Sequence, residues 1–330
     1  MAQHPNVISE KASTGAPNSA GEKAGGHVFV IFNPASGRGR GRERQRTYVE
    51  LLNDAGVEFE HATTSCPGGE RDLAEKALAN GVTTIVAVGG DGTWSNVAGC
   101  IVASGRADVS LGLLPAGSGN DFAKSFGITY REPIGAVHAI ARGRIRSVDV
   151  GRIRFPDEDT PDRHFLLETS FGIGPAVLQA AKGARFLKGD LLYSVTAIKQ
   201  IFRFKGVLAD VDDANGSVSG GRHLMLVVAN APNMGGSFLI APEARLDDGK
   251  LDVCAIEDSG PLERLRLFRM AGAGEHGRSD RVTFRQNGAF TIRFTAPEPY
   301  EVDGELLMST SLVAQVDSVP RALRVIVATP

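Results

Sequence analysis

The sequence predicts a chain of two domains: an α/β domain with a parallel sheet, followed by a β-rich domain. In the first half, apolar runs alternate with helical stretches such as Glu70–Asn80 and Ile134–Arg142. Beyond about residue 150, strand-like runs separated by Gly, Asp, Pro and Asn dominate, which is typical of antiparallel structure. A length of 330 residues also favours two domains over one.

Three segments follow from this change of pattern. Residues 1–26 are rich in Ala, Gly, Ser and Asn and have no apolar core, so we expect a disordered tail. Such a tail is neither a signal peptide nor a membrane anchor. We expect the α/β domain at 27–149 and the β-rich domain at 150–319.

Composition excludes several classes of protein. The apolar fraction is 42% and the formal net charge is −2, which describes an ordinary globular chain with no general attraction for nucleic acid. No apolar run approaches the roughly 18 residues that span a bilayer. The three cysteines, Cys66, Cys100 and Cys254, are far apart and lack metal-ligand spacing, so they fit a reducing cytoplasm.

The most informative stretch is Val-Gly-Gly-Asp-Gly-Thr at residues 88–93, between a strand-like run and the helical segment Trp94–Ala103. A strand that ends in glycines and opens into a helix brings backbone N–H groups close to a phosphate. Asp91 is poorly placed there unless a cation lies between the charges, so we interpret it as contacting metal-bound phosphate or a reacting hydroxyl. Taken alone, the motif is equally well a tight turn.

A second strand-like run, Val28–Phe32, ends in a comparable loop. It leads into Asn-Pro-Ala-Ser-Gly at 33–37 and then into alternating glycines and arginines at 37–42. Three arginines between glycines suit an exposed loop that binds a polyanion, or a flexible loop whose charges are simply solvated.

A third run, Leu111–Pro115, also ends in a glycine-rich polar loop. Ser118 offers a hydroxyl there, and Asn120 or Asp121 is suited to cap a helix that starts near Phe122. In an open parallel sheet the carboxyl ends of the strands lie on one edge, where ligands bind. Three such loops on one edge predict an anion-binding site.

The chain resembles the diacylglycerol kinase catalytic-domain family, and within it the soluble bacterial lipid kinases related to sphingosine and ceramide kinases. The matching motifs occur in the family's order from about residue 27 to the end. They are NPASG at 33–37, Thr63-Thr64, GGDGT at 89–93, PAGSGNDFA at 115–123, VDVG at 148–151, LDDGKLDV at 246–253 and VDGE at 302–305. NAD kinases share GGDGT, whereas the whole set points to lipid kinases.

The resemblance implies more about the fold than the residues do alone. It implies an N-terminal Rossmann-like three-layer α/β domain of the NAD kinase and diacylglycerol kinase type. It further implies a C-terminal β-sandwich-like domain, with the active site in the cleft between the two domains. The last strand, Ala322–Val327, is expected to return to the first domain, so that residues 320–330 belong with it.

In the family, the NPxSG loop, a following threonine and the glycine-rich loops contact the nucleotide. The residues that this resemblance assigns to ATP binding are Asn33, Pro34, Ala35, Ser36, Gly37, Thr64 (with Thr63 as the adjacent alternative), Gly89, Gly90, Gly92, Thr93 and Ser118. Asp91 would act on Mg²⁺-ATP and is one of two expected catalytic residues.

The second expected catalytic residue is Glu305 of the VDGE motif at 302–305, which matches the family's proposed general base. A lipid alcohol is a poor nucleophile unless a carboxylate accepts its proton. The same four residues also read as a β-hairpin turn, because Asp-Gly is a strong turn signal. Both interpretations can hold, since a turn can carry the base.

The remaining acids are assigned to magnesium by the resemblance. Asp149 and Asp303 match acids of the family's magnesium and water network. A separate structural magnesium site would use the Asp248 carboxylate with the carbonyls of Arg245 and Lys250, the oxygen ligands that Mg²⁺ prefers.

The chain departs from the family pattern next to two of these motifs. GGDGT is usually followed by x-Asn-Glu-Val, whereas this chain has Trp94-Ser95-Asn96-Val97, so the usual acid of that helical turn is missing. The family's Gly-Asp-Ala after the threonine is here Gly69-Glu70-Arg71. The departure leaves open how charge is balanced around Asp91.

The resemblance implies an ATP- and Mg²⁺-dependent lipid kinase that phosphorylates a diacylglycerol-like lipid, ceramide or a sphingoid base. Two alternatives are an NAD kinase-like enzyme acting on a soluble dinucleotide and a non-catalytic nucleotide-binding regulator. The expected partners are a membrane lipid substrate and the membrane surface, with no nucleic acid. We expect a cytoplasmic protein, peripheral at the inner face of the membrane. The oligomeric state is left open, with a homodimer as one option.

A long helical segment is expected near 174–204, and its second part is basic and aromatic. The segment 182–205 contains six basic residues and a single acid, Asp190, and apolar side chains are interleaved with them. Such a helix can lie on anionic lipid. The alternative is a helix that packs on the second domain and leaves its basic residues solvated.

Overall fold

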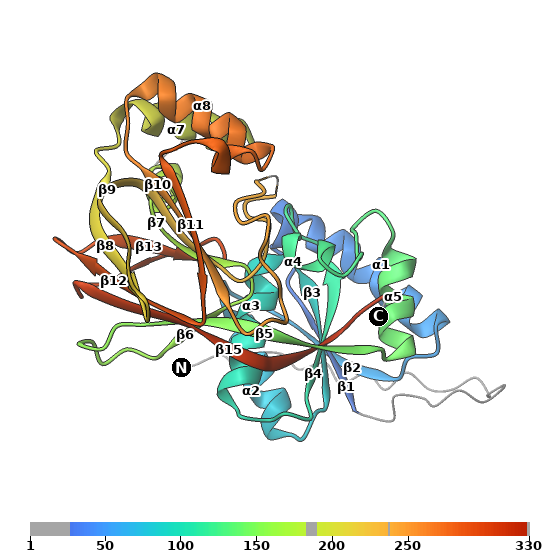
Figure 1. Cartoon of the computed structure of the whole chain (residues 1–330). Coiled ribbons are helices and arrows are strands. Elements are labelled where there is room, and N and C mark those ends of the chain that lie inside the picture. The colour runs from blue at the N-terminus through green and yellow to red at the C-terminus, as the bar shows by residue number, and fades with distance from the viewer. Residues whose placement is uncertain (1–26, 183–189, 237, 329–330) are drawn as a thin grey trace, which may run out of the picture. The chain divides into compact units, whose positions relative to one another are not determined.

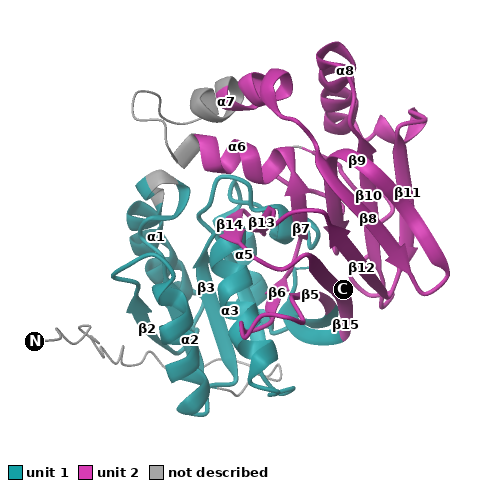
Figure 2. Ribbon diagram, turned by 90° about the vertical axis from the view of Figure 1, so that its left-hand side faces the viewer, with its two compact units in different colours: residues 1–148, 321–330 teal, residues 149–320 magenta. Residues whose placement is uncertain are grey.

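The structure is a computed structural model that describes residues 27–182, 190–236 and 238–328. The chain divides into two compact units, residues 1–148 with 321–330 and residues 149–320 (Figure 2). We call them unit 1 and unit 2 and describe each by itself. The disordered tail expected at residues 1–26 lies outside the described residues.

Unit 1 contains a parallel sheet with the strand order β2-β1-β3-β4-β15. The strands are β1 (Val28–Phe32), β2 (Phe59–Thr63), β3 (Thr84–Gly89), β4 (Ser110–Pro115) and the end of β15 (Val313–Ile326). The central residues of β1, β3 and β4 are mostly buried, which explains their continuous apolar runs, whereas β2 at the edge is only partly buried.

Helices cover both faces of this sheet, with α1 and α5 on one side and α2 and α3 on the other (Figure 1). The helical elements are η1 (Ser36–Gly39), α1 (Arg40–Asp54), α2 (Gly69–Ala79), α3 (Asp91–Ala103), α4 (Asp121–Lys124) and α5 (Pro133–Arg142). This arrangement confirms the predicted three-layer α/β domain.

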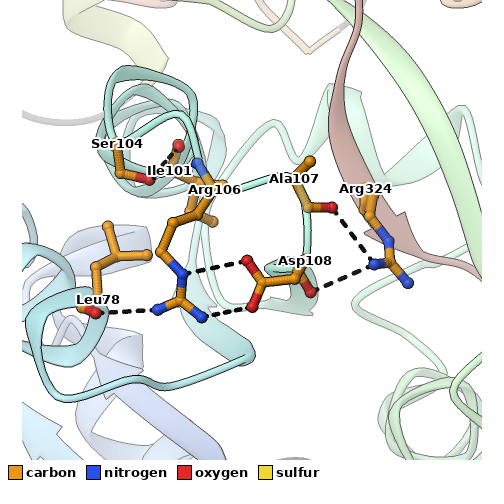
Figure 3. A network of polar contacts seen from close by, with 7 residues as sticks. All are labelled: Leu78, Ile101, Ser104, Arg106, Ala107, Asp108 and Arg324. Carbon is orange, nitrogen blue, oxygen red and sulfur yellow. Dashed lines mark hydrogen bonds and ion pairs between the residues drawn. The ribbon is translucent and has the colours of Figure 1, made fainter.

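The C-terminal strand is attached beside β4 by a polar network at the amino end of that strand (Figure 3). Arg324 donates to the carbonyls of Ala107 and Asp108 at 3.4 and 3.3 Å. Arg106 binds the Asp108 carboxylate and the Leu78 carbonyl, the latter at 3.0 Å. The network therefore joins the returning strand to the loop before β4 and to the end of α2.

Unit 2 is built from antiparallel strands. In hydrogen-bonding order they run β14-β13-β7-β9-β8-β12-β15; β9 also pairs with β10, and β10 with β11. The strands are β5 (Ile145–Arg154), β6 (Arg163–Phe165), β7 (Glu168–Gly172), β8 (Val207–Asp213), β9 (Gly216–Ala229), β10 (Leu251–Glu257), β11 (Val282–Asn287), β12 (Ala289–Phe294), β13 (Pro299–Val302) and β14 (Glu305–Met308). The chain passes between the units within β5 and within β15.

The helical elements of unit 2 are α6 (Ile173–Lys182), α7 (Asp190–Arg203), α8 (Pro261–Gly272) and η2 (His276–Arg278). One apolar cluster lies among the strands, where the rings of Phe171 and Phe294 are 4.7 Å apart. In a second cluster, Leu267 and Ala271 of α8 pack with Cys254 of β10. None of the helices in the described ranges is long and apolar enough to cross a membrane.

Some elements differ from the sequence predictions. The strand expected at 164–170 is split into β6 and β7, because the N–H groups of Leu166 and Leu167 donate to the Asp303 carboxylate instead of a neighbouring strand. The segment expected to be helical near 174–204 forms α6 and α7, and residues 183–189 lie outside the described ranges. Helix α8 was not predicted.

Candidate active site

Three strands of unit 1 end level with one another at one edge of the sheet. Phe32 of β1 pairs with Val88 of β3, and Val88 pairs with Leu114 of β4. The residues that follow these strands are therefore neighbours, as predicted for loops at the carboxyl edge of a parallel sheet. Thr64 joins the same edge, since its N–H donates to the Phe32 carbonyl at 2.9 Å.

Asn33 holds the first loop and attaches it to α3. Its Oδ1 accepts the N–H of Ala35 at 3.0 Å, and its Nδ2 donates to the Thr93 hydroxyl at 3.0 Å. Its own N–H donates to the Val88 carbonyl at 3.0 Å. The structure thus connects a residue predicted from the NPASG motif with one predicted from GGDGT, 60 positions away.

The glycine–arginine run at 37–42 is helical, which corrects the expectation of an exposed loop. Residues Ser36–Gly39 form η1 and α1 begins at Arg40, while the side chains of Arg38 and Arg40 lie outside what the structure describes. A Cβ atom on Gly41 would lie 2.3 Å from the Asn33 carbonyl oxygen. The glycine therefore allows α1 to start directly against the Asn33 loop.

Asp91 connects the second and third loops. Helix α3 begins at Asp91 itself, and one carboxylate oxygen accepts the N–H of Phe122 in α4 at 3.0 Å. Asp91 therefore caps α4, whereas neither Asn120 nor Asp121 supplies the side-chain cap expected from the sequence. Asn120 instead exchanges two hydrogen bonds of 3.0 Å with the backbone of Gly117.

The glycines of these two loops are in direct backbone contact. A Cβ atom on Gly117 would lie 2.5 Å from the Cα of Gly90, and one on Gly90 would lie 2.9 Å from the Cα of Gly117. The Gly89 carbonyl accepts the N–H groups of Ala116 and Gly117 at 2.6 and 3.0 Å. Glycine is required at 90 and 117 because the chains approach too closely for any side chain.

The predicted nucleotide residues differ in how accessible they are. Gly92 and Ser118 are exposed, Asp91 is half-buried, and Thr64 and Thr93 are buried. The first N–H groups of a helix have no acceptor within the helix, so the start of α3 offers donors beside exposed backbone. The edge of unit 1 therefore combines amide donors, a hydroxyl and one carboxylate, which is a set suited to metal-bound phosphate.

The amide that replaces the family acid at position 96 takes part in a half-buried polar cluster. Asn96 Nδ2 donates to Glu70 Oε1 at 2.6 Å, and Asn96 Oδ1 accepts from Arg71. Glu70 is almost completely buried in the first turn of α2. A carboxylate is therefore retained behind the GGDGT loop, but it is carried by α2 instead of α3.

We expect Asn96→Asp to lower the free energy of unfolding by about 1–3 kcal/mol, because it removes the donor to the buried Glu70 carboxylate and adds a second negative charge beside it. Urea denaturation measures the loss. Adding Glu70→Gln to this variant supplies a new donor and should restore most of the stability. An Asn96→Asp variant as stable as the parent would contradict this description of the cluster.

In unit 2, Glu305 stands at the end of a two-residue hairpin turn. Val302 of β13 pairs with Glu305 of β14, and the intervening Asp303 and Gly304 have φ angles of 45° and 85°. Both residues are in the left-handed region that this type of turn requires. The Glu305 side chain follows this turn and is exposed to solvent.

Asp303 fixes this turn to the neighbouring chain. Its carboxylate accepts the backbone N–H groups of Leu166, Leu167 and Glu168 at 2.7, 2.9 and 3.0 Å. Both oxygens are therefore used by amides, which makes Asp303 a positioning residue for the turn that carries Glu305. Its predicted part in a magnesium network stays a prediction.

Asp149 lies with the predicted structural magnesium turn. It is completely buried, and its carboxylate accepts the N–H of Gly249 at 2.6 Å. Within that turn, Asp248 accepts the N–H of Lys250 at 3.0 Å, and Arg245 is exposed. The structure therefore places Asp149 beside the turn of Asp248 and Lys250, two of the three residues expected to bind the structural Mg²⁺.

The residue that connects these groups is Asn230, which was not predicted from the sequence. Its Nδ2 donates to the carbonyls of Asp149 and Leu166 at 3.1 and 2.9 Å. Leu166 in turn donates to Asp303, so Asn230 links the two acids through backbone. Its Oδ1 is buried and has no hydrogen-bond partner among the described residues. The only sequence signal was a polar residue directly after the buried strand β9.

Several acidic side chains lie close to this turn. Burial raises the pKa of the Asp252 carboxyl, and the negative charges of Asp248 and Glu243 raise it further. Within the described ranges, no group of three or more His, Cys, Asp or Glu could hold a metal ion. A cation here would therefore depend on backbone carbonyls as well as Asp248, in line with the ligand set of Mg²⁺.

Glu301 is a further buried acid of the Glu305 hairpin. Its Oε2 accepts the Ser170 hydroxyl at 3.1 Å, and a backbone hydrogen bond from Gly304 also reaches it. Burial raises the pKa of the Glu301 carboxyl to about 7, and the charge of Asp303 adds to the rise, whereas the Ser170 hydrogen bond opposes it. The residue lies two positions before Asp303 and was not singled out from the sequence.

We expect Glu301→Gln to flatten the pH dependence of stability. Between the ordinary pKa of 4.5 and about 7, the folded chain keeps a proton that the unfolded chain releases, so the unfolding free energy falls as pH rises. Glutamine does not titrate, so the variant should lose this contribution to the slope, which is at most about 1.4 kcal/mol per pH unit. Urea midpoints across this range measure it, with the exposed Glu257→Gln as control. An unchanged slope would show that Glu301 does not titrate in this window.

Comparison with known proteins agrees with these two halves. Residues 27–153 match the family described as the diacylglycerol kinase catalytic domain, and residues 168–327 match the YegS C-terminal NAD kinase beta sandwich-like domain. A probable lipid kinase YegS-like protein of Xanthomonas campestris is 30% identical over 304 residues, covering 90% of this chain and 95% of the relative. The chain belongs to the diacylglycerol kinase-like family of lipid kinases.

Members with other names are similar over the same length. A diacylglycerol kinase of Mycobacterium tuberculosis is 26% identical to this chain over 306 residues, which cover 91% of this chain and 95% of the relative. A crystal structure of a putative diacylglycerol kinase from Bacillus anthracis has a TM-score of 0.72 at 19% identity, covering 93% and 98% of the two chains. That likeness confirms the two-domain fold class.

Proposed function

We propose that this chain is an ATP- and Mg²⁺-dependent lipid kinase that transfers the γ-phosphate of ATP to a lipid hydroxyl. The observation that carries the proposal is the connected edge of unit 1, where Asn33 bonds Thr93 and Asp91 bonds Phe122. Three separate loops are thereby held as one surface of amide donors around a single half-buried carboxylate.

Phosphoryl transfer needs the phosphates held, their charge neutralised and the attacking hydroxyl aligned. In unit 1, the amides around Gly90 and Gly92 and the hydroxyl of Ser118 hold the phosphates. In unit 2, Glu305 accepts the proton of the lipid hydroxyl. Asp303 keeps the turn that carries Glu305 in place by accepting three backbone amides.

Magnesium bound with ATP neutralises the phosphate charge, and Asp91 is the residue of unit 1 that would hold it. The hydrogen bond of 3.0 Å from the Phe122 amide holds this carboxylate beside the exposed backbone of Gly92. A structural Mg²⁺ would be held in unit 2 by Asp248 and the carbonyls of Arg245 and Lys250, beside the buried Asp149.

The acceptor we propose is a membrane lipid with a free hydroxyl, of the diacylglycerol, ceramide or sphingoid-base type. Such lipids stay in the bilayer, so the enzyme would work as a cytoplasmic protein at the inner surface of the membrane. Relatives named diacylglycerol kinase and YegS-like lipid kinase support this class of acceptor.

The test is an acceptor panel. Purified protein is incubated with ATP, Mg²⁺ and, one at a time, diacylglycerol, ceramide, a sphingoid base, phosphatidylglycerol or NAD, and products are identified by mass spectrometry. We expect a phosphorylated lipid and no phosphorylated NAD. Phosphorylation of NAD alone would overturn the proposal in favour of a soluble dinucleotide kinase.

A further inference from the structure

Helix α8 presents an apolar and basic face to solvent. Leu262 is 81% exposed and Leu265 is 40% exposed, and Arg266 and Arg269 are exposed beside them. These four positions follow the i, i+3, i+4, i+7 spacing of one helical face. The buried face of α8 is formed by other residues, Arg264, Leu267 and Ala271. The exposed leucines are therefore not needed for the core of unit 2.

The last turns of α7 lie beside α8 and also carry exposed apolar and basic side chains. The backbone carbonyl of Ile201 accepts a hydrogen bond of 2.8 Å from Arg264 of α8, so the two helices are in contact (Figure 1). Ile198 and Phe202 of α7 are 53% and 58% exposed. The basic residues Lys199 and Arg203 are exposed on the same turns. We call these four residues of α7, with Leu262, Leu265, Arg266 and Arg269 of α8, the α7–α8 face.

The charges of this face are predominantly positive. Its four cations are accompanied by Glu263, which forms an ion pair of 3.0 Å with Arg266. A hollow of about 440 Å³ lies on the α8 side, and its lining includes Leu262, Leu265 and Arg269 together with Glu275. Glu275 is itself paired with Arg278 at 3.0 Å. Three further basic residues of the segment 182–205, Lys182, Arg185 and Lys188, lie outside the residues whose side chains the structure describes.

We propose that the α7–α8 face lies on the surface of an anionic bilayer, with its leucine, isoleucine and phenylalanine side chains inserted between headgroups. Exposed apolar side chains that alternate with lysine and arginine match such a bilayer. The apolar side chains can enter the acyl-chain boundary, and the cations can contact the negatively charged headgroups. Each basic residue near an anionic surface adds about 1 kcal/mol, roughly a fivefold gain in binding. The proposal rests on the lipid kinase function and names the partner that brings the enzyme to its substrate.

Binding of the full-length protein to vesicles tests this face without any use of catalysis. We expect the parent chain to sediment with vesicles of phosphatidylcholine and phosphatidylglycerol, and to be released by salt. Arg266→Gln with Arg269→Gln should weaken binding roughly 10- to 30-fold. Leu262→Gln with Leu265→Gln should weaken it at any salt concentration. The exposed residues Arg293→Gln and Leu312→Gln, elsewhere on unit 2, are the matched controls.

The outcomes separate this inference from the proposed function. Activity on a water-soluble short-chain diacylglycerol should be unchanged in both double variants, since neither touches the catalytic residues. Vesicle binding that is equal in parent and variants would overturn the inference and leave the kinase assignment intact. A parent dimer that the leucine variants convert to monomer would also overturn it, in favour of a contact between copies. Vesicle binding without phosphorylation of any lipid would instead overturn the proposed function alone.

Discussion

Replacing Glu305 by glutamine is expected to lower the turnover number for lipid phosphorylation by about 10²–10⁴-fold. Glutamine has the size of glutamate but cannot accept the proton of the attacking hydroxyl. The side chain is exposed and its backbone is fixed by pairing with Val302, so we expect the variant to keep the fold. Steady-state kinetics with a lipid acceptor measure the loss, and equilibrium binding should give an unchanged Kd for ATP.

The exposed Glu257→Gln at the end of β10 is a matched control and should keep full activity. A Glu305→Gln enzyme that retains most of its turnover would contradict the assignment of the base. A loss of ATP binding with a normal melting temperature would also contradict it, because it would place Glu305 in the nucleotide site.

The second large effect is expected at Asp91, where charge and structure can be separated. Asp91→Asn keeps an oxygen that can accept the Phe122 N–H but removes the negative charge, so we expect a roughly 10²–10³-fold loss of turnover with little loss of stability. Asp91→Ala removes the cap of α4 as well and should cost about 1 kcal/mol of unfolding free energy. Kinetics and urea denaturation of both variants measure the two effects.

Asp108→Asn is the control for this pair, because Asp108 precedes the amino end of β4, whereas the three loops follow the carboxyl ends of their strands. It should leave turnover unchanged. Suppose that Asp91→Asn is as active as the parent while Asp91→Ala is unstable. Asp91 would then only cap a helix, and the proposal that it acts on Mg²⁺-ATP would be wrong.

The edge of unit 1 could be predicted because each signal was local. Buried strands in a parallel sheet read as continuous apolar runs, and β1 and the expected strand Val28–Phe32 coincide. The order of the loops along the edge then follows from the parallel arrangement. What periodicity could not supply is the identity of the contacts, such as the capping of α4 by Asp91 across 31 positions.

Long-range contacts also explain the failures in unit 2. The strand expected at 164–170 breaks because Asp303, more than 130 positions away, takes the N–H groups of Leu166 and Leu167. Asn230 belongs to no recognisable sequence motif, and only the fold brings its side chain to the backbone carbonyl of Asp149. Helix α8 was overlooked because its apolar residues alternate with arginines on a face that is half solvated. A shared site of the two units stays a prediction.

The central claim is transfer of phosphate from ATP to a lipid, and the most direct measurement follows that phosphate. Radiolabelled ATP is incubated with the protein and diacylglycerol in mixed micelles, and label is counted in the organic phase after extraction. We predict label in the lipid that depends on Mg²⁺, is abolished by EDTA and is nearly absent with Glu305→Gln. Label that stays in the aqueous phase with every lipid acceptor, although the protein binds ATP, would contradict the account.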